Sequence, residues 1–115
     1  MDIHPETEKQ LAEFEHLRAQ YQSIATHLMQ FKQVFRETTR AIEEMETLKS
    51  DAKVYKEVGS LLIEVDDKTK LKEELNEKKE TMEIRLKALQ SQETELKEHL
   101  TKMQADLELA LKKEN

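Results

Sequence analysis

The side chains that could bind a metal are few in this 115-residue chain and are scattered along it. The four histidines are His4, His16, His27 and His99. Only Glu13 and His16 have the i, i+3 spacing of a ligand pair in a di-iron helical bundle. Such a site needs a second pair with this spacing, which the sequence lacks, so ordinary surface histidines are the favoured interpretation.

Nucleophilic and phosphate-binding chemistry has equally little support. The chain contains no cysteine and one glycine, and no serine lies in a recognisable nucleophile motif. A phosphate-binding loop requires several glycines at fixed spacing, and covalent catalysis requires an activated nucleophile. We therefore expect no catalytic residue, no cofactor and no metal, and we favour a protein that is not an enzyme.

The chain is polar in composition, but its apolar residues are regularly spaced. Charged residues make up 38% of the sequence and aromatic residues 4%, and there is no tryptophan. A chain this polar is a poor candidate for a compact globular core. Its apolar residues recur periodically, however, and this separates a coiled coil from a disordered polar chain.

The charge balance argues against two kinds of partner. Twenty-five acidic residues against 19 basic ones give a formal net charge of −6. Without clustered Lys or Arg, the chain suits nucleic-acid phosphates poorly, and no apolar run is long enough to cross a membrane. The first residues are acidic and polar, unlike a secretory signal, so we expect a soluble, cytoplasmic protein.

The first half of the chain carries a seven-residue apolar repeat between residues 14 and 45. Such a repeat keeps one seam of a helix facing its partner under left-handed supercoiling. Pro5 suits a first helical turn, and this helix is expected at about residues 6–50. Its two seam positions hold Phe14, Tyr21, Leu28, Phe35 and Ile42, and Leu17, Ile24, Phe31, Thr38 and Met45.

A second helix is expected at about residues 67–112. Asp66 or Asp67 can cap its N-terminus by accepting a backbone N–H. Lys79 and Glu93 interrupt its seam, and we expect both side chains to reach water along a narrow two-helix interface. The alternative for Glu93 is a pair with His27, which the antiparallel register places near it. The apolar seam residues are Leu75, Met82, Leu86, Leu89, Leu96, Leu100, Met103 and Leu107.

Two helices of matched length with a short connector favour an antiparallel pair within one chain. The expected partners across the seam are Met45 with Leu75, Phe31 with Leu89, and Phe14 with Leu107.

The connector itself is enriched in β-branched and aromatic residues, and Gly59-Ser60 supplies a turn signal. It predicts a β-hairpin with strands at about residues 53–57 and 61–65. A lone two-stranded hairpin is marginal in water, and its open edges need partners. We therefore expect several copies to pool their hairpins into a closed sheet or barrel. The alternative is an apolar linker packed against its own helices.

At these residues the chain resembles the β-class subunit of prefoldin, a hexameric co-chaperone. Glu46-Thr47-Leu48 leading into residues 52–59 is similar to the family's entry into its hairpin, and residues 61–65 are similar to its second strand. Residues 86–93 resemble the middle of its second helix. The resemblance covers essentially the whole chain, residues 1–115, as one prefoldin-like domain. A single hairpin and a short length favour the β class over the longer α class.

The resemblance implies a hexamer of two α-class and four β-class subunits. In it, pooled hairpins form a β-barrel platform that carries coiled-coil arms. It also implies that the arm tips capture non-native polypeptides and deliver them to a group II chaperonin without ATP. The hairpin residues expected to carry assembly are Val54, Tyr55, Val58, Gly59, Leu61, Ile63 and Val65.

Both chain ends are expected at the free end of the arms, where the coil frays and exposes apolar side chains. Exposed apolar surface often marks a binding site; the alternative is that these residues merely complete the coiled coil. The candidate client-binding residues are Ile3, Leu11, Phe14, Leu17, Met103, Leu107, Leu109 and Leu111. The acidic residues that could dock on a basic chaperonin surface are Asp106, Glu108 and Glu114.

The expected fold class is mainly α: a long antiparallel two-helix coiled-coil hairpin joined by a short β-hairpin that oligomerises into a β-barrel platform. The expected function is that of an ATP-independent holdase subunit. The alternative is a structural coiled-coil scaffold or spacer between other proteins. A scaffold would not need the hairpin and would tolerate helix through residues 53–65, so hairpin-dependent assembly separates the two functions.

Overall fold

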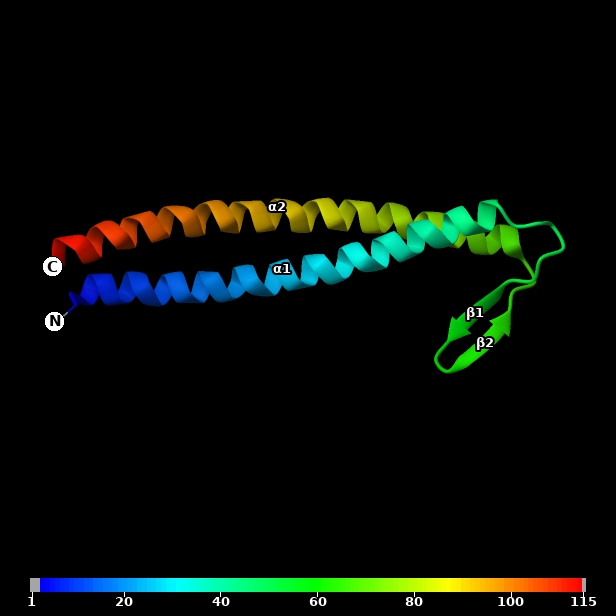
Figure 1. Cartoon of the computed structure of the whole chain (residues 1–115), viewed down its shortest axis with the longest axis horizontal. Helices are drawn as coiled ribbons and strands as arrows, with labels where there is room; N and C mark the ends of the chain where they lie inside the picture. The colour runs from blue at the N-terminus through cyan, green and yellow to red at the C-terminus, as the bar shows by residue number, and fades with distance from the viewer. Residues whose placement is uncertain (1–2, 115) are drawn as a thin grey trace. The chain divides into compact units, whose positions relative to one another are not determined.

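The chain is mainly helical, with one short β-hairpin between two long helices (Figure 1). The computed structural model describes residues 3–114. Helix α1 covers Pro5–Glu46 and α2 covers Lys68–Glu114. Strands β1 (Tyr55–Val58) and β2 (Leu61–Glu64) lie between them in the sequence and pair antiparallel. The expected fold class is thereby confirmed as two long helices separated by a hairpin.

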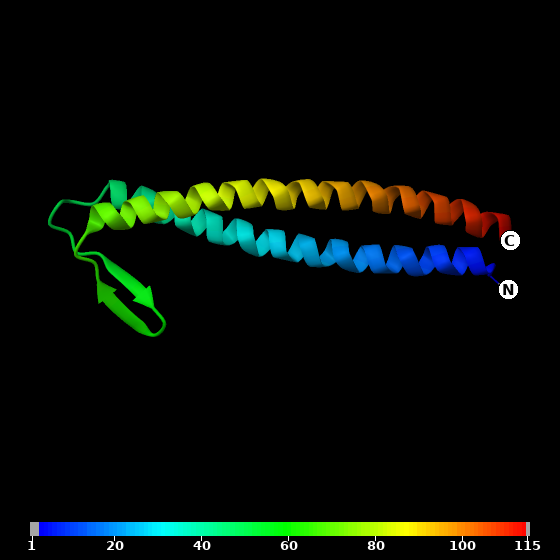
Figure 2. The same ribbon diagram turned by 180° about the vertical axis from the view of Figure 1, so that it is seen from behind.

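The chain divides into two compact units. Unit 1 combines the residues up to Gln30 with those from Leu86 onward, and unit 2 comprises Phe31–Arg85. Within each unit the segments of α1 and α2 lie side by side and run in opposite directions, as the views from both sides agree (Figures 1 and 2). The hairpin belongs to unit 2.

The seam of unit 1 follows the heptad positions expected from the sequence. Leu28 of α1 is 3% exposed and Leu107 of α2 is 6% exposed. Thr7 is buried too, and its hydroxyl contacts Glu114. Thr7 lies one heptad before Phe14 and Glu114 one heptad after Leu107, so this contact follows the expected Phe14–Leu107 register.

The seam of unit 2 keeps the same register. Thr38, Ile42 and Met82 are buried, and the Thr38 hydroxyl lies 3.8 Å from the Met82 sulfur. That pair lies one heptad from the expected Met45–Leu75 pair. The buried hydroxyl of Thr38 also donates to the Val34 carbonyl at 2.9 Å, so it is not left without a partner.

Polar residues interrupt the seam at the two expected places. Lys79 and Glu93 are both half-buried, which is where heptad spacing places them. Their long stems can cover apolar surface while the charged groups reach water. In unit 2 the guanidinium of Arg85 lies 5.8 Å from the centre of the Phe31 ring, a cation–π contact at the edge of the seam.

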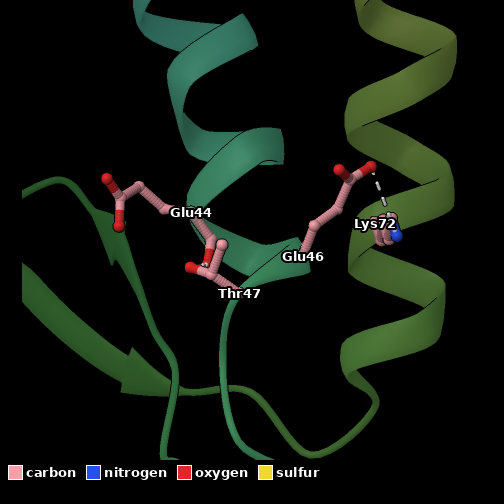
Figure 3. Close-up of polar contacts among 4 residues, drawn as sticks. All are labelled: Glu44, Glu46, Thr47 and Lys72. Atoms are coloured by element: carbon pink, nitrogen blue, oxygen red, sulfur yellow. Dashed lines mark hydrogen bonds and ion pairs between the residues drawn. The ribbon is translucent and has the colours of Figure 1, made fainter.

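Helix α1 ends at Glu46 rather than at about residue 50. The cause lies at Thr47, whose hydroxyl and backbone N–H both donate to the Glu44 carbonyl, at 3.0 and 3.3 Å (Figure 3). Bonds to the residue three positions back tighten the last turn and take the acceptor that a continuing helix would use. The neighbouring Glu46 carboxylate forms an ion pair with Lys72 of α2 at 3.6 Å.

The connector is fixed to the start of α2 at several points. The Lys68 ammonium donates to the Ser50 carbonyl at 3.1 Å. Asp67, rather than Asp66, caps α2, because its carboxylate accepts from the backbone N–H of Lys70 at 3.0 Å. The helix begins directly after this cap and continues to Glu114, two residues beyond the expected end.

The strands start and end slightly away from the expected residues. Strand β1 begins at Tyr55 and ends at Val58, next to a two-residue turn formed by Gly59 and Ser60. Gly59 has a φ of 61°, which a glycine adopts without strain and which suits the tight turns of hairpins. A further bond from the Val65 N–H to the Val54 carbonyl at 2.8 Å extends the ladder beyond the strands.

Replacing Asp67 with Ala should lower the free energy of unfolding by about 1 kcal/mol, because a helix N-cap would be lost. Asp66→Ala is the matched control, since it removes the same charge beside the helix end without removing a hydrogen bond found in the structure. Urea unfolding followed by circular dichroism measures both changes. Equal losses for the two variants would contradict the capping role and point to charge alone.

Candidate functional site

The β-hairpin presents apolar side chains on both of its faces. The pairs Lys56–Ile63 and Val58–Leu61 project to one side, and the pairs Tyr55–Glu64 and Glu57–Leu62 project to the other, because facing residues share a side and successive residues alternate. The first face therefore gathers Val58, Leu61 and Ile63. The second combines Tyr55 and Leu62 with two acids.

These side chains are open to solvent in the single chain. Leu62 is 72% exposed, Leu61 65% and Tyr55 54%, and Val58 and Ile63 are each about half exposed. Single exposed apolar residues are common on protein surfaces. Five of them within ten positions form a concentration of exposed apolar surface, which is typical of an interaction site. The sequence reasoning omitted Leu62 from its site residues, although the run from Leu61 to Ile63 signals that both faces need cover.

The base of the hairpin is less exposed than its end. Val54 and Val65 are half-buried, and Val65 lines a shallow groove of about 220 Å³ together with Lys56 and Leu71 of α2. The hairpin thus has partial support from its own helix at the base and none from it over Leu61 and Leu62. This rules out a structureless linker packed against its own helices over the described residues 55–64.

The sheet edges add hydrogen-bonding capacity to the apolar faces. Among the residues that the structure describes, the sheet consists of β1 and β2 alone, so each strand keeps one unpaired edge. Unpaired edges are templates for further strands. A surface with two apolar faces and two open edges is suited to pairing with other hairpins, and it has no arrangement of groups for catalysis.

The second candidate surface is the tip, which we define as residues 3–17 and 103–114 of unit 1. Ile3, Leu11, Leu109 and Leu111 are exposed, with Leu109 at 59%. The exposure of Leu109 and Leu111 fits their positions away from the seam. Phe14, Leu17 and Met103 are half-buried, and Leu107 is buried. The tip thus combines exposed apolar side chains with others that the seam covers.

A groove runs along one side of the tip. It has a volume of about 510 Å³, and its apolar lining comes from Ala12, Leu17 and Met103, with His16 and His99 beside them. Sequence analysis did not select Ala12 or the two histidines. Small and polar side chains carry no apolar signal of their own, and only the pairing of the helices places them at one groove.

The three acidic docking candidates lie in two different settings. Asp106 and Glu108 are exposed. Glu114 is half-buried and turned toward the start of α1, where its Oε1 accepts from the Thr7 hydroxyl at 2.6 Å and from the His4 backbone N–H at 3.3 Å. This contact across the helix pair was not anticipated from the sequence.

Other kinds of site find no support in residues 3–114. No group of three His, Cys, Asp or Glu side chains in this part of the chain could hold a metal ion. Over the same residues, neither helix has an apolar stretch long enough to span a membrane. The hairpin and the tip are therefore the surfaces on which a functional interpretation depends.

Sequence comparisons link this chain to one family. The prefoldin subunit family pattern matches residues 8–114. The prefoldin subunit beta of Thermococcus gammatolerans is 38% identical over 111 residues, covering 96% of this chain and 94% of the relative. That of Saccharolobus islandicus is 37% identical over 109 residues, covering 95% of this chain and 86% of the relative.

Solved structures agree with the sequence comparisons. The crystal structure of the prefoldin beta subunit from Thermococcus strain KS-1 matches with a TM-score of 0.80 and 36% sequence identity, covering 96% of both chains. The beta2 subunit from the same strain has 23% identity and a TM-score of 0.69, and supports the fold alone. With two paired helices and an intervening hairpin, this chain belongs to the prefoldin family, whose members are chaperone subunits rather than enzymes.

Proposed function

We propose that this chain is a β-class subunit of a prefoldin hexamer and acts as an ATP-independent holdase. The observation that carries the proposal is the β-hairpin, whose two apolar faces and two open edges are exposed in the single chain. A dimeric spacer has no use for such a hairpin. The relatives named prefoldin subunit beta support the same assignment.

Assembly through the hairpin is the first part of the proposal. Copies of β1 and β2 pair edge to edge into a β-barrel platform, burying residues that water now reaches. Two α-class and four β-class subunits make up the hexamer, and the whole chain acts as one prefoldin-like domain within it. The assembly residues are Val54, Tyr55, Val58, Gly59, Leu61, Ile63 and Val65.

Capture of non-native polypeptides at the tip is the second part. Unfolded chains expose apolar segments, and Leu11, Leu109 and Leu111 offer exposed apolar side chains to them. Met103 lines the neighbouring groove, and a thioether side chain adapts to clients of varied shape. Phe14, Leu17 and Leu107 join this surface where the helix ends fray, and Ile3 extends it beyond the start of α1.

Transfer of the client to a group II chaperonin is the third part. Asp106 and Glu108 place exposed negative charge at the tip, which is suited to a basic surface on the chaperonin. Glu114 is the third proposed docking residue, and it becomes available when its contact with Thr7 opens. The proposed setting is the cytoplasm. No nucleic acid, membrane or cofactor takes part.

Native mass spectrometry of the full chain, alone and mixed with an α-class prefoldin subunit, tests the assembly. The expected product of the mixture is a hexamer that contains four copies of this chain. A homodimer under both conditions would contradict the proposal and favour a coiled-coil spacer.

Replacing Val58 and Ile63 together with Asp should abolish this hexamer. Both side chains lie on one hairpin face, and a carboxylate buried there without a partner costs about 3 kcal/mol or more, which weakens association more than about a hundredfold. Helix content from circular dichroism should stay nearly unchanged. The matched control is Val34→Asp with Ile84→Asp, which adds the same charges at exposed helical positions. A native hexamer formed by the hairpin variant would refute hairpin-driven assembly.

Deleting residues 103–115 should leave the hexamer intact and weaken client capture by about tenfold, because several apolar contacts of the tip are lost. The measurement is suppression of the aggregation of a chemically unfolded client protein. The double variant Leu109→Ser, Leu111→Ser keeps the seam residues and separates lost contacts from a frayed arm. Undiminished suppression by both proteins would place the client site elsewhere.

A further inference from the structure

One polar contact closes the tip of unit 1. Glu114 lies in the last turn of α2, and its side chain crosses to the start of α1. The Thr7 hydroxyl donates to Glu114 Oε1 at 2.6 Å, and the His4 backbone N–H donates to the same oxygen at 3.3 Å. Thr7 is only 6% exposed, so the contact is shielded from water on the α1 side.

The favourable interactions of the Glu114 carboxylate come from α1 rather than from its own helix. A carboxylate in the last turn of a helix faces the negative end of its own helix dipole, where Lys112 and Lys113 are the favourable residues. The first turn of another helix offers unpaired N–H groups and the positive end of a dipole. Glu114 therefore serves α1 as a capping residue supplied by the other helix, with Thr7 as a second donor.

Only one of the two oxygens of this carboxylate is hydrogen-bonded in the contact. Its second oxygen, Oε2, is buried and has no hydrogen-bond partner among the residues that the structure describes. Burying such an oxygen without a partner opposes the contact by an amount comparable to what a charge-assisted hydrogen bond contributes. The unpartnered oxygen thus weakens the contact and favours its opening.

The apolar residues next to this contact are those that opening would uncover. Leu107 lies one heptad before Glu114 on the seam and is buried. Leu111 lies one turn after Leu107 on α2, and Leu11 lies one turn before Phe14 on α1; both are already partly exposed. Leu107 lies about two turns from Glu114, so it joins these two in a larger exposed apolar surface when the last two turns of α2 separate from α1.

We propose that the Thr7–Glu114 contact is a clasp that limits how much of the apolar seam the tip exposes, and that it thereby regulates client capture. This inference rests on the proposed function, in which the tip captures non-native polypeptides. With the clasp closed, Leu107 stays buried in the seam and contacts no client. With the clasp open, Leu107 becomes part of the surface that binds clients.

Opening the clasp by substitution is the first test. Thr7→Val removes the donor hydroxyl and keeps the shape, and Glu114→Ala removes the acceptor. In the full chain assembled into its complex, amide exchange of residues 107–113 should become about five- to tenfold faster, because loss of such a hydrogen bond shifts a local opening equilibrium by about that factor. Client capture should strengthen by a similar factor.

The matched controls lie in the same unit and leave the clasp untouched. Thr101→Val removes a hydroxyl that bonds only to the Lys97 carbonyl of its own helix, and Glu98→Ala removes an exposed carboxylate. Neither should change exchange at residues 107–113 or client capture. Equal effects of the controls and of the clasp variants would overturn the proposal.

Locking the clasp is the second test, and the absence of native cysteine makes it direct. Thr7→Cys with Glu114→Cys, joined by a short bis-maleimide, should capture client several-fold more weakly than the same protein before bridging. Thr38→Cys with Met82→Cys, bridged in the same way, cross-links the seam of unit 2 and should leave capture unchanged.

The outcomes distinguish this inference from the proposed function. If the unmodified complex captures clients but neither opening nor locking alters exchange or capture, the clasp is refuted while the holdase function stands. If no protein captures a client, yet opening accelerates exchange and increases binding of an apolar dye at the tip, the control of seam exposure by the clasp is supported, while the holdase function and the regulation of client capture are refuted.

Discussion

Two helices packed along a single heptad seam can cover only one stripe of each other. Among the described residues of this chain no side chain is completely buried, and the least exposed apolar residues are Leu28, Ile42, Met82 and Leu107. All four occupy seam positions. Apolar side chains away from the seam, such as Val34 and Ile84, therefore stay exposed in the single chain. The exposed hairpin and the exposed Leu109 and Leu111 of the tip both follow from this limit, because they lie off the seam.

Polar contacts hold the connector between α1 and α2 in unit 2. Thr47 ends α1, the Asp67 carboxylate starts α2, and Lys68 reaches back to Ser50. These polar contacts fix the entry and exit of the hairpin without burying it. The ion pair between Glu46 and Lys72 is largely solvated and contributes little. A lone two-stranded hairpin is marginal in water, so this hairpin is suited to stabilisation by pairing with further strands.

The helices, their antiparallel register and the turn at Gly59 were predictable from the sequence. A heptad repeat is a property of many residues at once, so single errors do not change it. The end of α1 was not predictable, because it depends on which donor takes the Glu44 carbonyl. The Thr7–Glu114 contact was missed for a different reason: two polar residues far apart in the sequence give no signal until the register brings them together.

The hairpin and the tip expose different kinds of surface, and each kind suits a different strength of association. The hairpin combines open strand edges with residues such as Leu61 and Leu62, a surface that favours an association as permanent as a fold. At the tip, smaller apolar patches lie beside the Glu114 carboxylate, one oxygen of which is buried without a partner among residues 3–114. The buried oxygen offsets part of what the Thr7–Glu114 hydrogen bond contributes. The tip therefore suits weaker, reversible contacts, whereas the hairpin suits a more lasting association.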